Sequence, residues 1–129
     1  MAIADKAPSR MQMSVALRTA ISILRRWGAS TEQLLVILRI SRSTYARVKR
    51  NEEVSLDADQ LARTSMVLNS HAALRTVFDN PENVYGFMGM KNDNAYFSGR
   101  APLEVMARGD VISVYETYRR IDALRSALW

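Results

Sequence analysis

The chain has 129 residues, a formal net charge of +5, 48% hydrophobic and 24% charged residues, and no cysteine. This mixture is typical of one globular domain, or of two small helical modules that share a core, and it argues against disorder. The lack of cysteine excludes disulfides, cysteine nucleophiles and thiolate metal sites, and it fits a reducing cytoplasm. No apolar run approaches the ~20 residues that a membrane span needs, and residues 1–10 lack the apolar stretch of a signal peptide. We therefore expect a cytoplasmic protein with a flexible arm at residues 1–10.

The positive charge is concentrated in the first part of the chain. Residues 1–50 hold ten Lys or Arg and two acidic residues, a net charge of +8, whereas the remainder holds eight basic and eleven acidic residues, a net charge of −3. A basic half joined to a mildly acidic half predicts two surfaces with different partners. Solvated helix faces with a chance imbalance are the alternative.

Helical spacing of apolar residues dominates the chain, and no segment shows sustained two-residue alternation with β-branched residues. We predict an all-α fold with a loop over residues 91–99. In chain order, its helices should cover residues 12–27, 30–38, 42–50, 57–78, 81–90, 102–109 and 111–128. The final helix should bury Val111, Val114, Tyr118 and Ile121.

Residues 30–50 have the layout of a helix-turn-helix, because two short helices with apolar residues at core spacing are joined by a tight turn. In that motif the second helix enters the major groove of DNA, where arginine can pair with guanine and hydroxyls can reach bases or phosphates. The predicted DNA-binding residues are Arg42, Ser43, Thr44 and Arg47 toward the bases, with Lys49 and Arg50 on the phosphate backbone. The alternative is that the motif serves only packing or dimerisation. We take residues 11–55 as the helix-turn-helix module and residues 56–129 as a second unit.

The stretch Ile-Ser-Arg-Ser-Thr-Tyr-Ala-Arg at 40–47 resembles the helix-turn-helix of Xre-type transcriptional regulators. Two positions depart from that pattern. Leu35 stands where a small residue usually lets the helices approach, and Arg39 stands where glycine usually adopts the left-handed turn. If that turn persists, an arginine in it costs about 1 kcal/mol of backbone strain.

The C-terminal half carries a second set of motifs. They are Asn-Asp-Asn at 92–94, Phe-x-Gly-Arg at 97–100, Pro-Leu-Glu-x-Met at 102–106, and a glycine at 109 ahead of the final helix. This segment resembles the toxin-binding domain of Xre/MbcA/ParS-like antitoxins, and with the helix-turn-helix the resemblance covers about residues 15–128. Ala101 departs from the family, because it replaces the Ser or Thr that often caps the proline-started helix.

The resemblance implies an antitoxin from a two-gene type II toxin–antitoxin module. The cognate toxin would carry a RES domain that consumes NAD or transfers ADP-ribose. The antitoxin would form a homodimer, cover the NAD pocket of the toxin with its C-terminal region, and repress its own promoter by binding operator DNA. The candidate toxin-binding residues are Asn94, Tyr96, Phe97, Arg100, Arg119, Arg125 and Trp129. The alternative for Trp129 is a place in the core of its own chain.

No arrangement of residues predicts catalysis. His71 is the single histidine and has no cysteine to join it, so we expect no metal site. The acidic pair Asp57 and Asp59 stands at the start of a helix, where capping explains it. We therefore expect no catalytic residue, no cofactor and no small-molecule substrate. The alternative to an antitoxin is a stand-alone regulator whose C-terminal half only dimerises.

Overall fold

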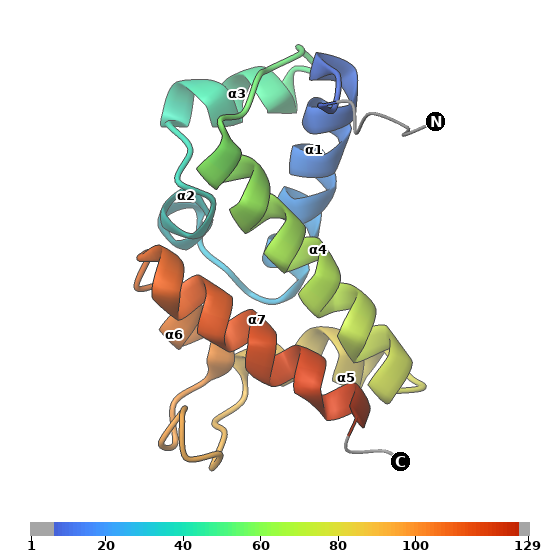
Figure 1. The fold of residues 1–129 in the computed structure, drawn as a ribbon, viewed down its shortest axis with the longest axis vertical. Helices are drawn as coiled ribbons and strands as arrows, with labels where there is room; N and C mark the ends of the chain where they lie inside the picture. The colour runs from blue at the N-terminus through green and yellow to red at the C-terminus, as the bar shows by residue number, and fades with distance from the viewer. Residues whose placement is uncertain (1–6, 127–129) are drawn as a thin grey trace, which may run out of the picture.

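The computed structural model describes residues 7–126, and every regular element within that range is a helix (Figure 1). The prediction of an all-α fold is therefore confirmed. In chain order the elements are α1 (Arg10–Arg26), α2 (Thr31–Leu38), α3 (Arg42–Lys49), α4 (Ala58–Val77), α5 (Pro81–Gly86), the 3-10 helix η1 (Phe87–Gly89), α6 (Pro102–Met106) and α7 (Val111–Ser126). Across residues 7–126, no helix is both long enough and apolar enough to cross a bilayer.

The longer helices begin where side chains satisfy the free N–H groups of the first turn. The Ser9 hydroxyl accepts a hydrogen bond from the N–H of Gln12 at 3.1 Å, and the Gln12 side chain accepts one from the N–H of Ser9 at 2.8 Å. This capping box starts α1 at Arg10, two residues before the predicted start. The same reciprocal arrangement opens α2 and α4, with the pairs Ser30–Gln33 and Asp57–Gln60.

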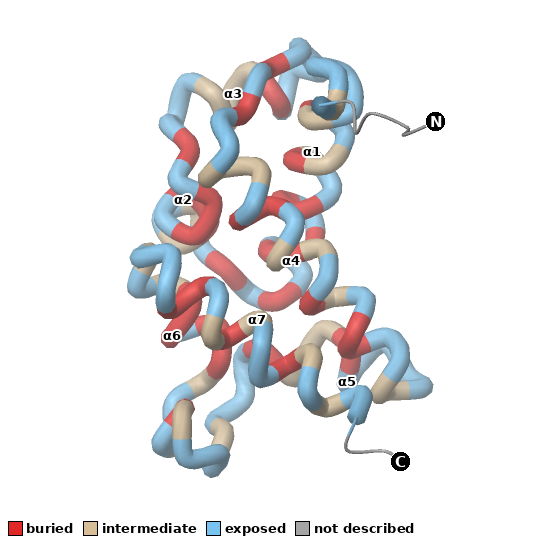
Figure 2. The backbone as a smooth tube through the Cα atoms, in the orientation of Figure 1, coloured by how far each residue is buried: buried red, intermediate tan, exposed pale blue. Residues whose placement is uncertain are grey.

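Helix α4 is the centre of the fold, and it packs against α1 and against α7 (Figure 1). One hydrophobic cluster of buried side chains runs through both halves of the chain. Figure 2 shows buried positions along the helices of both halves. The helix-turn-helix segment and the C-terminal helices therefore share a core. Its members from across the chain include Leu17, Leu24, Leu34, Leu38, Val67, Leu74, Met106, Val114 and Ile121.

The buried face of α7 differs in part from the predicted one. Val114 and Ile121 are buried as predicted. Tyr118 is only half-buried, and Val111 is 41% exposed, so the prediction that Val111 is buried is wrong. Apolar spacing alone assigned this residue to the inner face, but the helix is rotated so that neighbouring small residues turn inward.

Small polar residues are buried in both α4 and α7, two helices that pack against each other. Ser113 and Thr117 of α7 are 6% and 0% exposed, and Thr64 and Ser70 of α4 are both fully buried. Small side chains at a helix crossing let the two backbones approach closely. The Thr64 and Ser70 hydroxyls each donate a hydrogen bond to a carbonyl four residues earlier in α4, at 2.8 and 2.7 Å, so they are satisfied inside the core.

The turn between α6 and α7 lies directly against α2. Gly109 in this turn has a φ of +86°, in the left-handed region that glycine adopts most easily. A Cβ added to Gly109 would overlap Cγ1 of Val36 in α2. Both the backbone conformation and the close approach of α2 therefore require glycine at this position.

We expect Gly109→Ala to lower the free energy of unfolding by about 2 kcal/mol or more, because it combines left-handed strain with overpacking. Gly86→Ala is the matched control. Gly86 has an ordinary helical φ of −83°, and no atom lies within 4 Å of an added Cβ, so this change should be neutral or slightly stabilising. Thermal unfolding followed by circular dichroism compares the three proteins, and equal stability of the two variants would contradict the role assigned to Gly109.

Candidate nucleic-acid interface

Three residues, Arg39, Ile40 and Ser41, join α2 to α3 in a tight turn. Arg39 has φ 53° and ψ 47°, so the left-handed turn persists with an arginine in it. The Ile40 side chain belongs to the core at 6% exposure. The Ser41 hydroxyl accepts a hydrogen bond from the N–H of Thr44 at 3.0 Å and so caps α3. Leu35 is 9% exposed, so the motif accommodates the bulky residue at that position.

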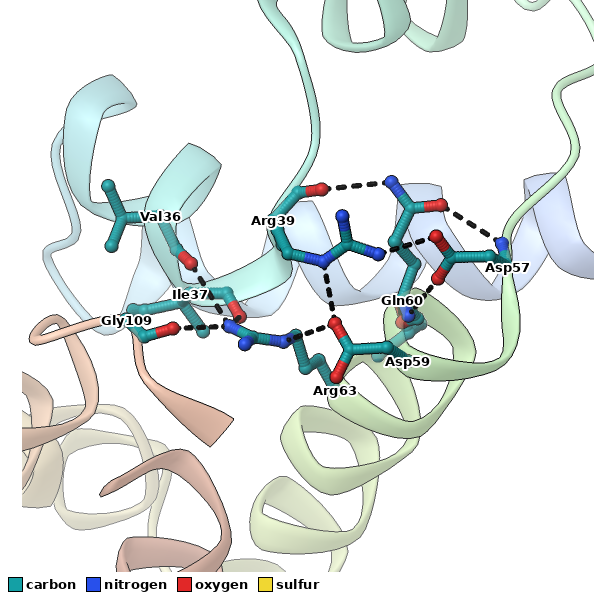
Figure 3. Close-up of polar contacts among 9 residues, drawn as sticks. Val36, Ile37, Arg39, Asp57, Asp59, Gln60, Arg63 and Gly109 are labelled. Carbon is teal, nitrogen blue, oxygen red and sulfur yellow. Dashed lines mark hydrogen bonds and ion pairs between the residues drawn. The ribbon is translucent and has the colours of Figure 1, made fainter. Parts of the chain in front are cut away.

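The side chain of Arg39 compensates for the strain in its own backbone by tying the turn to α4 (Figure 3). Its Nε donates to Oδ2 of Asp59 at 2.6 Å, and its terminal nitrogen donates to Oδ2 of Asp57. Its carbonyl accepts a hydrogen bond from Nε2 of Gln60 at 2.8 Å. A glycine at this position would relieve the strain but would lose the two ion pairs with the start of α4.

Arg63 of α4 extends this network into the interior (Figure 3). Its side chain is 6% exposed, and its Nε donates to the same Oδ2 of Asp59 at 2.9 Å. One terminal nitrogen donates to the carbonyl of Gly109 at 2.6 Å and, at longer range, to the carbonyls of Val36 at 3.4 Å and Ile37 at 3.3 Å. A single guanidinium thus connects the C-terminal end of α2, the first turns of α4 and the turn that precedes α7.

The exposed face of α3 collects most of the predicted DNA-binding residues. Four of them are exposed and share one side of the helix: Arg42, Ser43, Lys49 and Arg50. Thr44 and Arg47 are half-buried on the flank. The face is therefore basic and has a hydroxyl near its N-terminal end, as a helix that reads DNA requires.

Intramolecular contacts hold the cationic side chains of α3 in place. Arg42 pairs with Glu32 of α2, and Arg50 pairs with Glu52 at 2.7 Å. Arg47 donates to the carbonyl of Glu53 at 3.0 Å and lies 3.5 Å from the Glu52 carboxylate. Exposed ion pairs of this kind contribute only about 0–1 kcal/mol, so phosphate groups can replace the carboxylates at little cost. Spacing along the sequence did not reveal this role for the acidic residues, because Glu32 lies on another helix.

The predicted toxin-binding loop is held together by its own backbone and side chains. The carbonyl of Asn94 accepts from the N–H groups of Phe97 at 3.0 Å and Ser98 at 2.9 Å, and its side chain accepts from the N–H of Tyr96 at 2.9 Å. Phe97 is 2% exposed, so its ring supports the loop from inside. Tyr96 is half-buried, and the guanidinium of Arg120 lies 5.0 Å from the centre of its ring, which brings the loop beside α7.

The remaining candidates for toxin binding lie on exposed surface or beyond the described range. Arg100 is exposed in the loop. Arg119 and Arg125 project from the exposed side of α7, each beside an acidic residue one turn away. Trp129 lies outside the described residues.

The sequence pattern did not predict a group of exposed apolar side chains at the start of α7. Ile112 is 70% exposed, Tyr115 and Val111 are 43% and 41% exposed, and Val36 of α2 is 43% exposed beside Gly109. The signal is the apolar run after the glycine turn, and of the exposed side chains in it the sequence pattern assigned only Val111 to the core.

The comparisons with known proteins agree with this geometry. Residues 14–69 match the antitoxin Xre-like helix-turn-helix domain. The uncharacterized protein y4oB of Sinorhizobium fredii is 30% identical to the chain over 110 residues, which cover 84% of this chain and 83% of that protein. The chain belongs to the family of y4oB, and its N-terminal part is similar to the antitoxin Xre-like helix-turn-helix domain. No solved structure matches the chain.

The match to this domain supports a DNA-binding antitoxin or regulator. The matched range begins in α1 and ends within α4, so it includes Arg39, Asp59 and Arg63. The contacts that fix the helix-turn-helix turn therefore lie inside the domain. The carbonyl of Gly109 lies outside it and links the domain to the rest of the chain.

The two carboxylates of the network carry lowered pKa values. The pKa of Asp57 lies below its ordinary value because the N–H of Gln60, and after it the Arg39 guanidinium, stabilise the charged form. The pKa of Asp59 is lowered chiefly by Arg39, with a further contribution from Arg63.

A carboxyl group whose folded pKa is lowered contributes stability that is complete above its unfolded pKa of about 3.9 and is lost as the pH falls through the folded pKa. We therefore expect the protein to lose stability on acidification below about pH 4. Arg39→Gln should be less stable than the wild type at neutral pH, and this difference should shrink toward about pH 2. Urea unfolding at several pH values measures it, with Arg119→Gln as a control that removes an equal charge. A difference that is independent of pH would contradict the role given to Arg39.

Proposed function

We propose that the protein is the antitoxin of a type II toxin–antitoxin module, that it neutralises a cytoplasmic RES-domain toxin, and that it represses its own promoter. The observation that carries the proposal is the match of residues 14–69 to an antitoxin domain, together with the basic α3 face described above. The motifs at 92–106, which resemble the toxin-binding domain of Xre/MbcA/ParS-like antitoxins, support the toxin as partner.

For DNA binding, α3 is the element that would enter the major groove. Arg42 and Ser43 stand at its N-terminal end, nearest the bases, and Lys49 and Arg50 stand where the helix would leave the groove beside the phosphate backbone. As a homodimer, the protein would place two such helices on half-sites about 34 Å apart. The operator would then be close to palindromic.

For toxin binding, the loop at 91–100 and the outer side of α7 would form the contact surface. Arg100, Arg119 and Arg125 offer exposed guanidinium groups, which are favoured interface anchors. The contact between Arg120 and Tyr96 makes the loop and α7 one continuous surface. Residues 56–129 would thus provide both toxin binding and dimerisation.

Removing the phosphate-facing cations should weaken DNA binding in a salt-dependent way. Lys49→Ala and Arg50→Ala should each weaken binding to the DNA upstream of the protein's own reading frame and lower the slope of log K against log salt by about one. Fluorescence polarisation over a salt series measures the slope. Lys91→Ala is the control, because Lys91 is an exposed lysine outside the helix-turn-helix. Slopes that stay unchanged in both α3 variants would exclude these residues from the interface.

Co-expression with the RES-domain protein of a neighbouring gene tests toxin neutralisation. Wild-type antitoxin should restore growth and co-purify with the toxin. The charge reversal Arg119→Glu with Arg125→Glu should abolish both effects, whereas Arg42→Ala with Arg50→Ala should preserve both and release the promoter from repression. A toxin that stays lethal beside the wild-type protein would overturn the proposal. A protein that still represses its promoter in that case would be a stand-alone regulator.

A further inference from the structure

A pocket of about 450 Å³ opens between the C-terminal ends of α1 and α4 and helix α5. Its volume lies within the range of ~300–1,000 Å³ that is typical of small-molecule sites. The polar lining includes Arg26, Arg75 and Asp79, and the apolar lining includes Phe78, Val84 and the ring of Tyr85. Helix α5 lies at the opposite end of the molecule from α3, so the pocket is separate from the candidate DNA-binding face (Figure 1).

The guanidinium group of Arg26 is held in place by stacking. Its central carbon lies 3.7 Å from the centre of the Tyr85 ring, and that ring stacks on His71 with 5.2 Å between ring centres and 26° between planes. The three groups come from α1, α5 and α4, so the stack connects three helices. Stacking uses the face of the guanidinium and leaves its N–H groups available, which is the arrangement that binds oxyanions well.

Among residues 7–126, no carboxylate pairs with either arginine of the pocket. Within residues 7–126, the side chains of Arg26 and Arg75 make no ion pair or hydrogen bond, although Asp79 lines the same pocket. The pKa of the His71 imidazole is lowered, first by burial and then by the positive charges of Arg75 and Arg26. Both arginines therefore lie close enough to act on the same group. Two unpaired guanidinium groups that act on one region favour a doubly charged anion over a single carboxylate.

We propose that this pocket binds a mononucleotide. The phosphate monoester pairs with Arg26 and Arg75, the ribose hydroxyls donate to the Asp79 carboxylate, and the base packs against Phe78 and Val84. A phosphorylated tyrosine side chain shares the phosphate and the ring, but it has no hydroxyl groups for the carboxylate. The carboxylate in an otherwise cationic pocket is what favours the nucleotide.

Isothermal titration calorimetry on the full chain tests the proposal with adenosine 5′-monophosphate, adenosine, inorganic phosphate and phosphotyrosine as probes. Adenosine 5′-monophosphate should bind most tightly, with one molecule per chain. Arg26→Gln and Arg75→Gln should each weaken its binding about tenfold, the loss expected for one charged hydrogen-bonded pair. Arg108→Gln is the matched control. Arg108 is an exposed arginine just before the start of α7, and it does not line the pocket. Circular dichroism checks that each variant is folded.

The single histidine gives a second measurement that does not depend on the variants. A bound phosphate offsets the positive charge of the two arginines, so the pKa of His71, followed by NMR, should rise on addition of adenosine 5′-monophosphate and stay unchanged with adenosine. Adenosine or inorganic phosphate binding as tightly as the nucleotide would overturn the proposal. Phosphotyrosine binding more tightly than the nucleotide, or equal weakening by Arg108→Gln, would overturn it as well.

Discussion

The rest of this fold depends on the buried guanidinium of Arg63, because its charge must be paired and hydrogen-bonded inside the protein. A charged group at 6% exposure is costly unless it is paired and hydrogen-bonded. Its partners are one carboxylate, Asp59, and three carbonyls, two of which belong to the last turn of α2. Carbonyls at a helix C-terminus lack partners inside the helix and carry partial negative charge, so they suit a cation. The third carbonyl belongs to Gly109, which brings the turn before α7 to the same point.

The geometry of the helix-turn-helix follows from this contact. Asp59 accepts from Arg63 on its buried side and from Arg39 on its exposed side, so the turn between α2 and α3 is anchored to α4 through one carboxylate. This second arginine supports a left-handed backbone that would otherwise be strained. The close approach of Gly109 to Val36 adds a contact between α2 and the turn before α7. The helix that would read DNA and the helix that would meet the toxin are therefore fixed relative to one another by a few neighbouring groups.

Two regions of the protein surface differ in whether their arginines have partners within the chain. The arginines of α3 contact acidic residues or carbonyls at the surface, so they are oriented but easily released to phosphates. Arg26 and Arg75, which line the pocket beside α5, have no such partners among the described residues. Net charge alone identified the basic half of the chain but not this difference, because pairing depends on which carboxylates the fold brings near. Arginines therefore gather in two separate regions, one with carboxylate or carbonyl partners and one without them among the described residues.

Local interactions were predictable from the sequence, since capping boxes, the proline-started helix and the glycine turns depend on residues within a few positions of each other. The helix-turn-helix and most of its exposed basic face were found in this way. The sequence did not reveal that Ser113 and Thr117 rather than Val111 face the core, or that Phe97 is buried. These outcomes depend on which helix packs against which, and apolar spacing does not record the distance between two backbones. The partners of Arg63 lie up to 46 residues away in the chain, so only the tertiary structure decided that a polar helix residue would become the buried junction of the protein.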